Sequence, residues 1–139
     1  MKMSVRGLVR IVAPAAFAFA AACSSDAGTS VTTPPPAPSG GWLTLQLVTP
    51  RTDDGAAQFA VRGPAIDSVK LIGYDGFATI QSGTANLIVT GAVTGGSVAQ
   101  IYVPDLSLAG EYQASIAAAA ARQTYVMQSL TGYRAVLVR

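Results

Sequence analysis

The sequence predicts an all-β fold, a small antiparallel β-sandwich that follows an export signal and a flexible spacer. From residue 42 onward, short runs of alternating apolar and polar residues recur about every ten residues, and glycine-rich stretches separate them. Strands with this spacing and this turn chemistry are typical of an antiparallel sandwich or barrel. The segment before residue 42 has a different composition and is treated first.

Residues 1–22 have the composition of an export signal. The first ten residues carry three basic side chains and no acid, and an uncharged apolar run follows up to Ala22. This run is shorter than the roughly twenty residues that a membrane-spanning helix needs, and Pro14 weakens any permanent span. We therefore expect residues 1–22 to be a signal peptide that is removed.

Cys23 is the only cysteine of the chain and directly follows three alanines. The stretch Ala20–Cys23 resembles the bacterial lipoprotein box, although Ala20 stands where the box prefers leucine. The resemblance implies that Cys23 becomes the first residue and is acylated with chains such as palmitate, each buried CH₂ adding about 0.8 kcal/mol to membrane binding. The second residue of the mature chain would then be Ser24 rather than Asp. By resemblance to lipoprotein sorting signals, this favours the outer membrane in a cell with two membranes. The alternative is an ordinary signal peptide cut nearby, which leaves a free thiol.

Residues 23–41 are rich in Ser, Thr, Pro and Gly and nearly lack large apolar side chains. Such a segment buries too little surface to offset its ordering entropy, so we expect a disordered linker that reaches roughly 50 Å when extended. The PPPAP stretch within it is also a ligand type for proline-recognising domains, which are mostly intracellular.

Composition excludes several classes of function. From Cys23 onward the chain has six basic and seven acidic residues, a net charge of −1, and the basic residues are scattered, which argues against nucleic-acid binding. No intramolecular disulfide is possible with one cysteine. The chain has no histidine, so Ser-His-Asp and Cys-His catalysis and histidine-based zinc sites are excluded. We expect no enzyme and no cofactor.

Residues 42–139 are long enough for one domain with one core. The first strand is predicted over Trp42–Val48, with its three leucines facing inward. A second run with Ala57, Phe59 and Val61 facing inward follows after a turn-like loop, and we expect these two runs to pair as a hairpin. Further strands are predicted over 66–74, 77–83, 86–93 and 97–105.

The segment Glu111–Gln123 is ambiguous, because its alanines favour a helix while Tyr112, Ala114, Ile116 and Ala118 alternate as in a strand. We predict a strand by a small margin. A closing pair of strands is expected at TYVMQSL and YRAVLVR, with a turn at Thr131 and Gly132.

The stretches GAAQFAV and GSVAQIYVP resemble a group of uncharacterised bacterial lipoprotein domains and, more distantly, cohesin-type domains, which are jelly-roll sandwiches related to carbohydrate-binding modules. The resemblance covers most of residues 42–139 and implies a sandwich of jelly-roll or cohesin-like type with a binding role. Cohesins are usually longer, and no dockerin-binding residues transfer to this chain.

Four residues of the domain are candidates for a site. Asp53 and Asp54 are adjacent acids beside Gly55, a pattern that is typical of a turn and, as the alternative, of calcium ligation together with loop carbonyls. Trp42 shares the polar face of its strand and Tyr74 adjoins a turn, so these two aromatics are expected to be the exposed ones. An exposed aromatic is a candidate platform for a sugar ring.

Three hypotheses of function follow. The first is a lipid-anchored module of the cell envelope that binds a protein or a polysaccharide, which predicts an exposed aromatic strip or a flat apolar patch on one sheet. The second is a structural envelope lipoprotein without a small-molecule ligand. Catalysis is the third and weakest, because the usual proton-handling side chain is absent.

Overall fold

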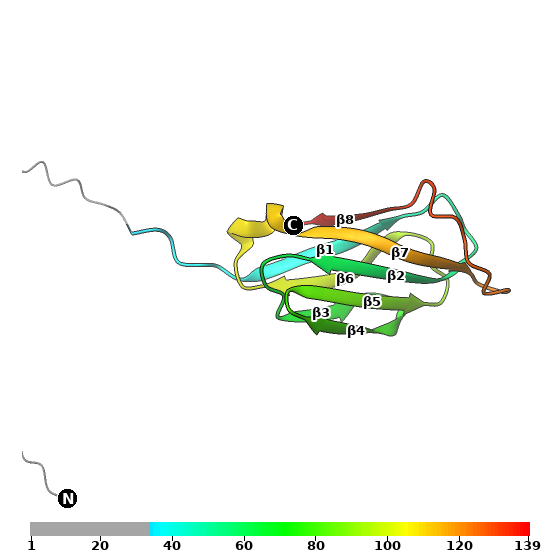
Figure 1. The fold of residues 1–139 in the computed structure, drawn as a ribbon, viewed down its shortest axis with the longest axis horizontal. Helices are drawn as coiled ribbons and strands as arrows, with labels where there is room; N and C mark the ends of the chain where they lie inside the picture. Colours follow the sequence, from blue (N-terminus) through cyan, green and yellow to red (C-terminus); the bar gives the residue numbers. More distant parts are fainter. Residues whose placement is uncertain (1–33) are drawn as a thin grey trace, which may run out of the picture. The chain divides into compact units, whose positions relative to one another are not determined.

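The computed structural model describes residues 34–139, in which eight strands form two antiparallel sheets (Figure 1). The predicted signal peptide, Cys23 and the spacer up to residue 33 lie outside the described residues. Within residues 34–139, no helix is long and apolar enough to cross a membrane.

Each sheet contains four strands. Sheet A has the order β3-β6-β1-β8, and sheet B has the order β4-β5-β2-β7. The elements are β1 (Gly41–Val48), β2 (Asp54–Arg62), β3 (Ser68–Leu71), β4 (Asp75–Gln81), β5 (Thr84–Thr90), β6 (Gly96–Val103), the 3₁₀ helix η1 (Leu106–Glu111), β7 (Gln113–Ala121) and β8 (Arg134–Val138). All neighbouring strands run antiparallel. The prediction of an all-β fold with two packed antiparallel sheets is confirmed.

The core lies between the inner faces of the two sheets. In β1 the leucines at 43, 45 and 47 are buried, while the residues between them face outward. In β2 the same period of two buries Ala57, Phe59 and Val61. The inward faces predicted from alternation are therefore confirmed for both strands.

The predicted hairpin between the first two runs is wrong. β1 pairs with β6 and β8 in sheet A, whereas β2 pairs with β5 and β7 in sheet B. The physical reason is that each strand has one strongly apolar face. With the strands in opposite sheets, those two faces bury each other across the core, and residues 49–53 span the gap between the sheets.

The alanine-rich segment is a strand, β7, as the sequence favoured by a small margin. Its ladder with β2 and the inward packing of Ala114, Ile116 and Ala119 outweigh the local preference of alanine for a helix. Ala117 is an extra residue in this ladder, because Ala118 pairs with Gln58 and Ile116 pairs with Phe59. The bulge lets β7 keep alternating contacts with the core on both sides of it.

The prediction of a strand at TYVMQSL is wrong. Residues 122–133 form a loop whose one ladder contact is a bridge between Ala120 and Met127. Tyr125 has a φ of 55°, which a strand does not permit. The predicted turn at Thr131 and Gly132 is present, because the Tyr133 N–H donates to the Leu130 carbonyl at 3.1 Å and Gly132 has a φ of 85°.

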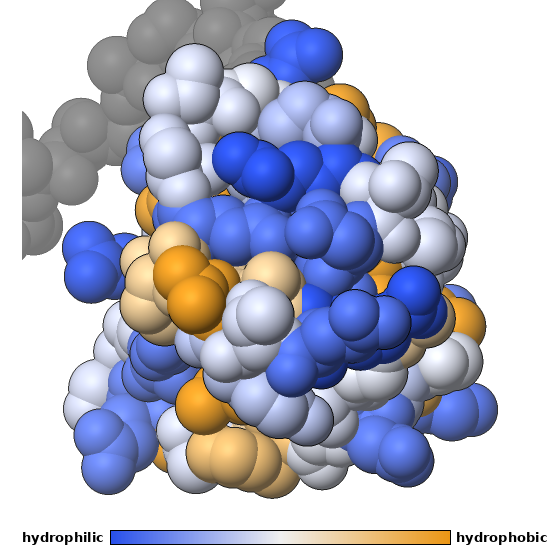
Figure 2. All heavy atoms as spheres, turned by 90° about the vertical axis from the view of Figure 1, so that its right-hand side faces the viewer, coloured by the Kyte–Doolittle hydropathy of each residue, from blue (hydrophilic) through white to orange (hydrophobic). Residues whose placement is uncertain are grey.

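The connections of residues 35–139 gather at two ends of the sandwich (Figure 1). One end holds the start of β1, η1 and the C-terminus, and there the Leu106 N–H donates to the Ser39 carbonyl at 2.8 Å. The other end holds the loops that follow β1, β3, β5 and β7. Figure 2 shows this second end, where small apolar patches are separated by polar residues.

Candidate functional site

The outer face of sheet A carries an aromatic pair at its β1–β6 ladder, in which Trp42 is exposed and Tyr102 is half-buried. Trp42 and Tyr102 are register partners, and their rings meet edge to face with centroids 5.1 Å apart and an interplanar angle of 70°. Trp42 remains 43% exposed. The pairing of β8 with β1 ends at Thr44 and Val138, so β8 does not extend alongside Trp42.

Neutral polar side chains lie beside this pair on the same face, and the exposed cation Lys70 stands opposite Gln100 on β3. Thr44 and Gln100 are partners one row further along the same face, and Gln46 follows two residues after Thr44 on β1. Ser68 lies opposite Tyr102 on the neighbouring strand β3. Aromatic surface next to amide and hydroxyl groups combines apolar contact with hydrogen-bond donors and acceptors, which suits a neutral polyhydroxylated ligand. We call Trp42, Thr44, Gln46, Gln100 and Tyr102 the Trp42 face.

The structure does not bring the two predicted aromatics together. Tyr74 is half-buried, packs against the core and donates its hydroxyl to the Gly95 carbonyl at 3.3 Å. Gly95 directly precedes β6, whereas Trp42 pairs near the end of that strand. Trp42 is thus available at the surface, and Tyr74 serves the packing of the opposite end. Sequence alternation found Trp42 but not its partner, because the identity of Tyr102 depends on the β1–β6 register.

The two adjacent aspartates differ in their surroundings. Asp53 is exposed, and its backbone carbonyl accepts from the Arg122 N–H at 2.7 Å. Asp54 is 1% exposed. Thr49 Oγ1 donates to Asp54 Oδ2 and Tyr133 Oη donates to Asp54 Oδ1, each at 2.6 Å. Asp54 therefore ties the β1–β2 connection to the end of the long loop 122–133, a role that the sequence did not reveal.

Tyr133 completes this buried cluster. Burial raises the pKa of its phenol, and the hydrogen bond with the neighbouring Asp54 carboxylate acts in the same direction. The amide oxygen of Gln128 lies 2.7 Å from the same hydroxyl. The Asp54 cluster, defined here as Thr49, Asp54, Gln128 and Tyr133, is a satisfied hydrogen-bond network.

The calcium hypothesis concerned Asp53 and Asp54. Among residues 34–139, no group of three or more acidic, cysteine or histidine side chains is placed to hold a metal ion. Since both carboxylate oxygens of Asp54 accept hydrogen bonds from hydroxyl groups, a cation would have to compete with Thr49 and Tyr133 for this ligand.

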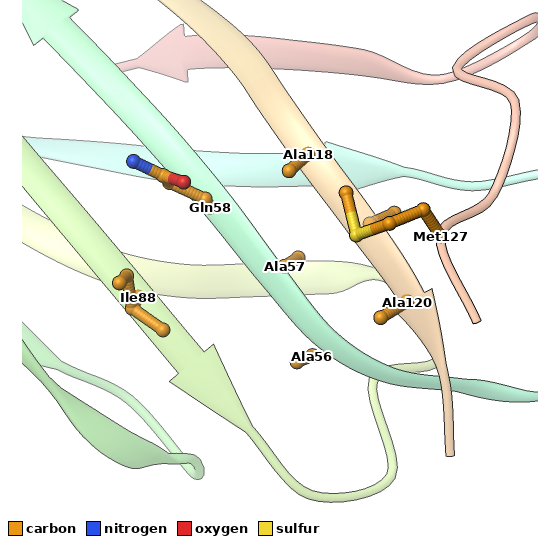
Figure 3. A pocket seen from close by; sticks show the side chains of 8 residues that line it. Ala56, Ala57, Gln58, Ile88, Ala118, Ala120 and Met127 are labelled. Atoms are coloured by element: carbon orange, nitrogen blue, oxygen red, sulfur yellow. The ribbon is translucent and has the colours of Figure 1, made fainter. Parts of the chain in front are cut away.

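A shallow apolar depression of about 150 Å³ lies on the outer face of sheet B (Figure 3). Alanines of β2 and β7 form its floor, and the larger side chains of Ile88 and Met127 stand at its two sides. The hollow forms because the outward positions Ala56, Ala118 and Ala120 carry small side chains. It was not predicted, because the sequence does not show that the alanines of β2 and β7 lie side by side.

Comparisons of the chain with protein-family models, curated proteins and solved structures found no match.

Proposed function

We propose that this protein is an exported, lipid-anchored module of the cell envelope that binds a neutral polysaccharide on the Trp42 face. The observation that supports the ligand class is the exposure of Trp42, which lies edge to face with Tyr102 on the outer face of sheet A. A large apolar ring on the surface contributes most when a ligand covers it. Polysaccharide rings offer the apolar faces and the hydroxyl groups that match this surface.

The surrounding residues favour an uncharged ligand. Thr44, Gln46 and Gln100 carry no charge. Two basic side chains stand at the margins of the face. Lys70 lies opposite Gln100 on the edge strand β3, and Arg139 directly follows Val138, the partner of Thr44, and donates to the Leu106 carbonyl. An anionic ligand would need several cationic donors for its charges. We therefore place neutral glycans ahead of acidic ones.

The proposed anchor rests on the sequence around Cys23, where a short apolar run ends in three alanines before the cysteine. Mass spectrometry of the mature amino terminus tests it: an acylated Cys23 is expected, and an unmodified thiol at this residue would refute the anchor. The variant Cys23→Ser is the matched control and should carry no acyl chain at this position.

The finer fold type is also a proposal. Strand pairs β1–β8, β2–β7, β3–β6 and β4–β5 are nested as in one long hairpin rolled on itself, and this supports a jelly-roll or cohesin-like sandwich. Such sandwiches leave the outer face of a sheet free for a ligand, as the Trp42 face is here.

A glycan array probed with residues 35–139, which form one compact unit, tests the ligand class. We expect binding to one family of neutral polysaccharides and its loss in Trp42→Ala. Tyr125→Ala is the matched control, because Tyr125 is 73% exposed and lies in the loop 122–133, outside both the Trp42 face and the strand β4. Uniformly negative arrays, or equal losses in both variants, would refute the carbohydrate proposal and leave a protein partner or a structural role.

A further inference from the structure

The free edge of sheet B is formed by β4, whose sequence is DGFATIQ. Six of its seven residues are exposed. Asp75, its first residue, is the one charged side chain in the strand. An edge strand of seven residues with a single charge, at its first position, presents a row of backbone groups that is suited to pairing with another strand.

The turn after β4 identifies the free backbone groups. Ser82 and Gly83 have φ values of 45° and 74° and connect β4 to β5 by two residues, so Gln81 and Thr84 form a hydrogen-bonded pair. Hydrogen-bonded and non-hydrogen-bonded pairs alternate along an antiparallel ladder, so the backbone groups of Thr79 and Phe77 also bond β5. The N–H and C=O groups of Gly76, Ala78 and Ile80 point away from the sheet.

The other three edges of the sandwich are protected. β3 has four residues and contains Lys70, and β8 has five residues and begins with Arg134. The end of β7 is covered by the long loop, since the Gln128 N–H donates to the Ala119 carbonyl at 2.8 Å and the Ala121 N–H donates to the Val126 carbonyl at 3.0 Å. The bulge at Ala117 twists the preceding part of β7. Short length, charge, bulges and covering loops are the usual protections of an edge.

We infer that β4 is an interface at which two copies of this chain pair antiparallel, with Ala78 facing Ala78 of the second copy. This register joins the two B sheets into one continuous sheet. The outward groups of Ala78 bond each other across the two-fold axis, and those of Gly76 bond those of Ile80.

The side chains match in this register. Ile80 lies over Gly76 of the second copy, where no side chain competes for the space, and Phe77 lies beside Thr79. Asp75 faces Gln81, so no like charges oppose each other. A shift by two residues would leave the outward groups of Gly76 or Ile80 without a partner in the second β4, so the proposed register pairs the most backbone groups.

The symmetry has one consequence for attachment. Because the paired strands run antiparallel, the Gly41 ends of the two domains lie at opposite ends of the joined sheet. β1, with eight residues, is about 27 Å long at roughly 3.4 Å per residue. The expected spacer, with a reach of roughly 50 Å, is long enough for both domains to lie along one surface.

Cysteine cross-linking of the full chain in intact bacteria tests the interface and its register. We expect that co-expression of Phe77→Cys and Thr79→Cys chains, treated with copper phenanthroline, gives at least fivefold more disulfide-linked dimer than either variant alone. In the proposed register these two positions face each other in a non-hydrogen-bonded pair, whereas identical positions lie on the diagonal, beyond the usual span of a disulfide. Ala78→Cys alone should also cross-link, because position 78 faces itself.

Val136→Cys is the matched control, since Val136 is 41% exposed on the edge strand β8 at the other side of the sandwich. The unsubstituted chain controls for links through Cys23. No excess of dimer over these controls, or equal yields from the single and the mixed Phe77→Cys and Thr79→Cys samples, would overturn the proposal. The test needs neither the ligand nor the lipid anchor, so its outcome is separate from that of the proposed function.

Discussion

The Asp54 cluster and the aromatic pair of the Trp42 face lie at opposite ends of the sandwich and use polar and aromatic side chains in opposite ways. In the Asp54 cluster, each oxygen of a buried carboxylate accepts a hydrogen bond from a hydroxyl group. On the Trp42 face, a 43% exposed indole lies on a neutral polar surface. In the Asp54 cluster the polar groups bond one another and hold the loops, whereas on the Trp42 face polar and aromatic groups are accessible to a ligand.

The largest expected effect on stability is that of Asp54→Ala. This change leaves the Thr49 and Tyr133 hydroxyl groups without their acceptor, and we expect it to lower the free energy of unfolding by roughly 3 kcal/mol. Urea denaturation of residues 35–139 measures the change. Asp53→Ala, at the exposed neighbour, should cost less than about 0.5 kcal/mol. Equal costs in the two variants would contradict the distinction between the two aspartates.

Tyr133→Phe should have an intermediate effect, because it removes one donor to Asp54 and retains the ring. We expect a loss of about 1 to 2 kcal/mol in the free energy of unfolding. Comparison with Asp54→Ala separates the contributions of the two hydrogen bonds to the carboxylate, since Thr49 still donates to Asp54 in Tyr133→Phe. A loss as large as that of Asp54→Ala would mean that Thr49 contributes nothing.

The same tyrosine predicts a pH dependence. Because the pKa of Tyr133 is raised in the folded domain, the folded state keeps this proton to a higher pH than the unfolded chain, in which tyrosine titrates near about 10. The associated stabilisation is complete below about pH 10 and is lost as the pH rises through the raised pKa. Unfolding free energies between about pH 8 and about pH 11 should therefore fall more steeply for the natural domain than for Tyr133→Phe. Parallel curves would contradict this assignment.

The effect of Trp42→Ala on stability should be smaller than the effects at Asp54 and Tyr133. Trp42 is partly exposed and loses one edge-to-face contact with Tyr102, so the cost should stay below about 1 kcal/mol. A cost near that of Asp54→Ala would show that Trp42 is part of the packing of the domain. This result would contradict the assignment of the Trp42 face as a free surface.

Local features of this chain were predictable from sequence, and contacts between distant residues were not. Alternation in β1 and β2 identified the inward leucines, Phe59 and the outward Trp42, because a period of two is a property of each strand alone. The sheet to which each strand belongs depends on the other strands, and the expected hairpin of the first two runs failed for this reason. Asp54 resembled a turn residue because its partner Tyr133 lies 79 residues away.

The candidate site also combines features that one strand determines with features that depend on strand pairing. The exposure of Trp42 followed from its own strand, whereas its pairing with Tyr102 required the β1–β6 register. The hollow on sheet B required the β2–β7 ladder, with its bulge at Ala117. Single surface residues are therefore more readily predicted from each strand than the surfaces that they form together.

Fluorescence titration is the most direct test of the central claim, because Trp42 is the only tryptophan of the chain. We predict that a soluble neutral oligosaccharide changes the Trp42 emission in a saturable manner, and that Tyr125→Ala leaves the titration unchanged. Calorimetry on the same samples provides an independent measure of binding. Absence of binding across neutral oligosaccharides, or binding in the calorimeter without any change in Trp42 emission, would contradict the assignment of the ligand to the Trp42 face.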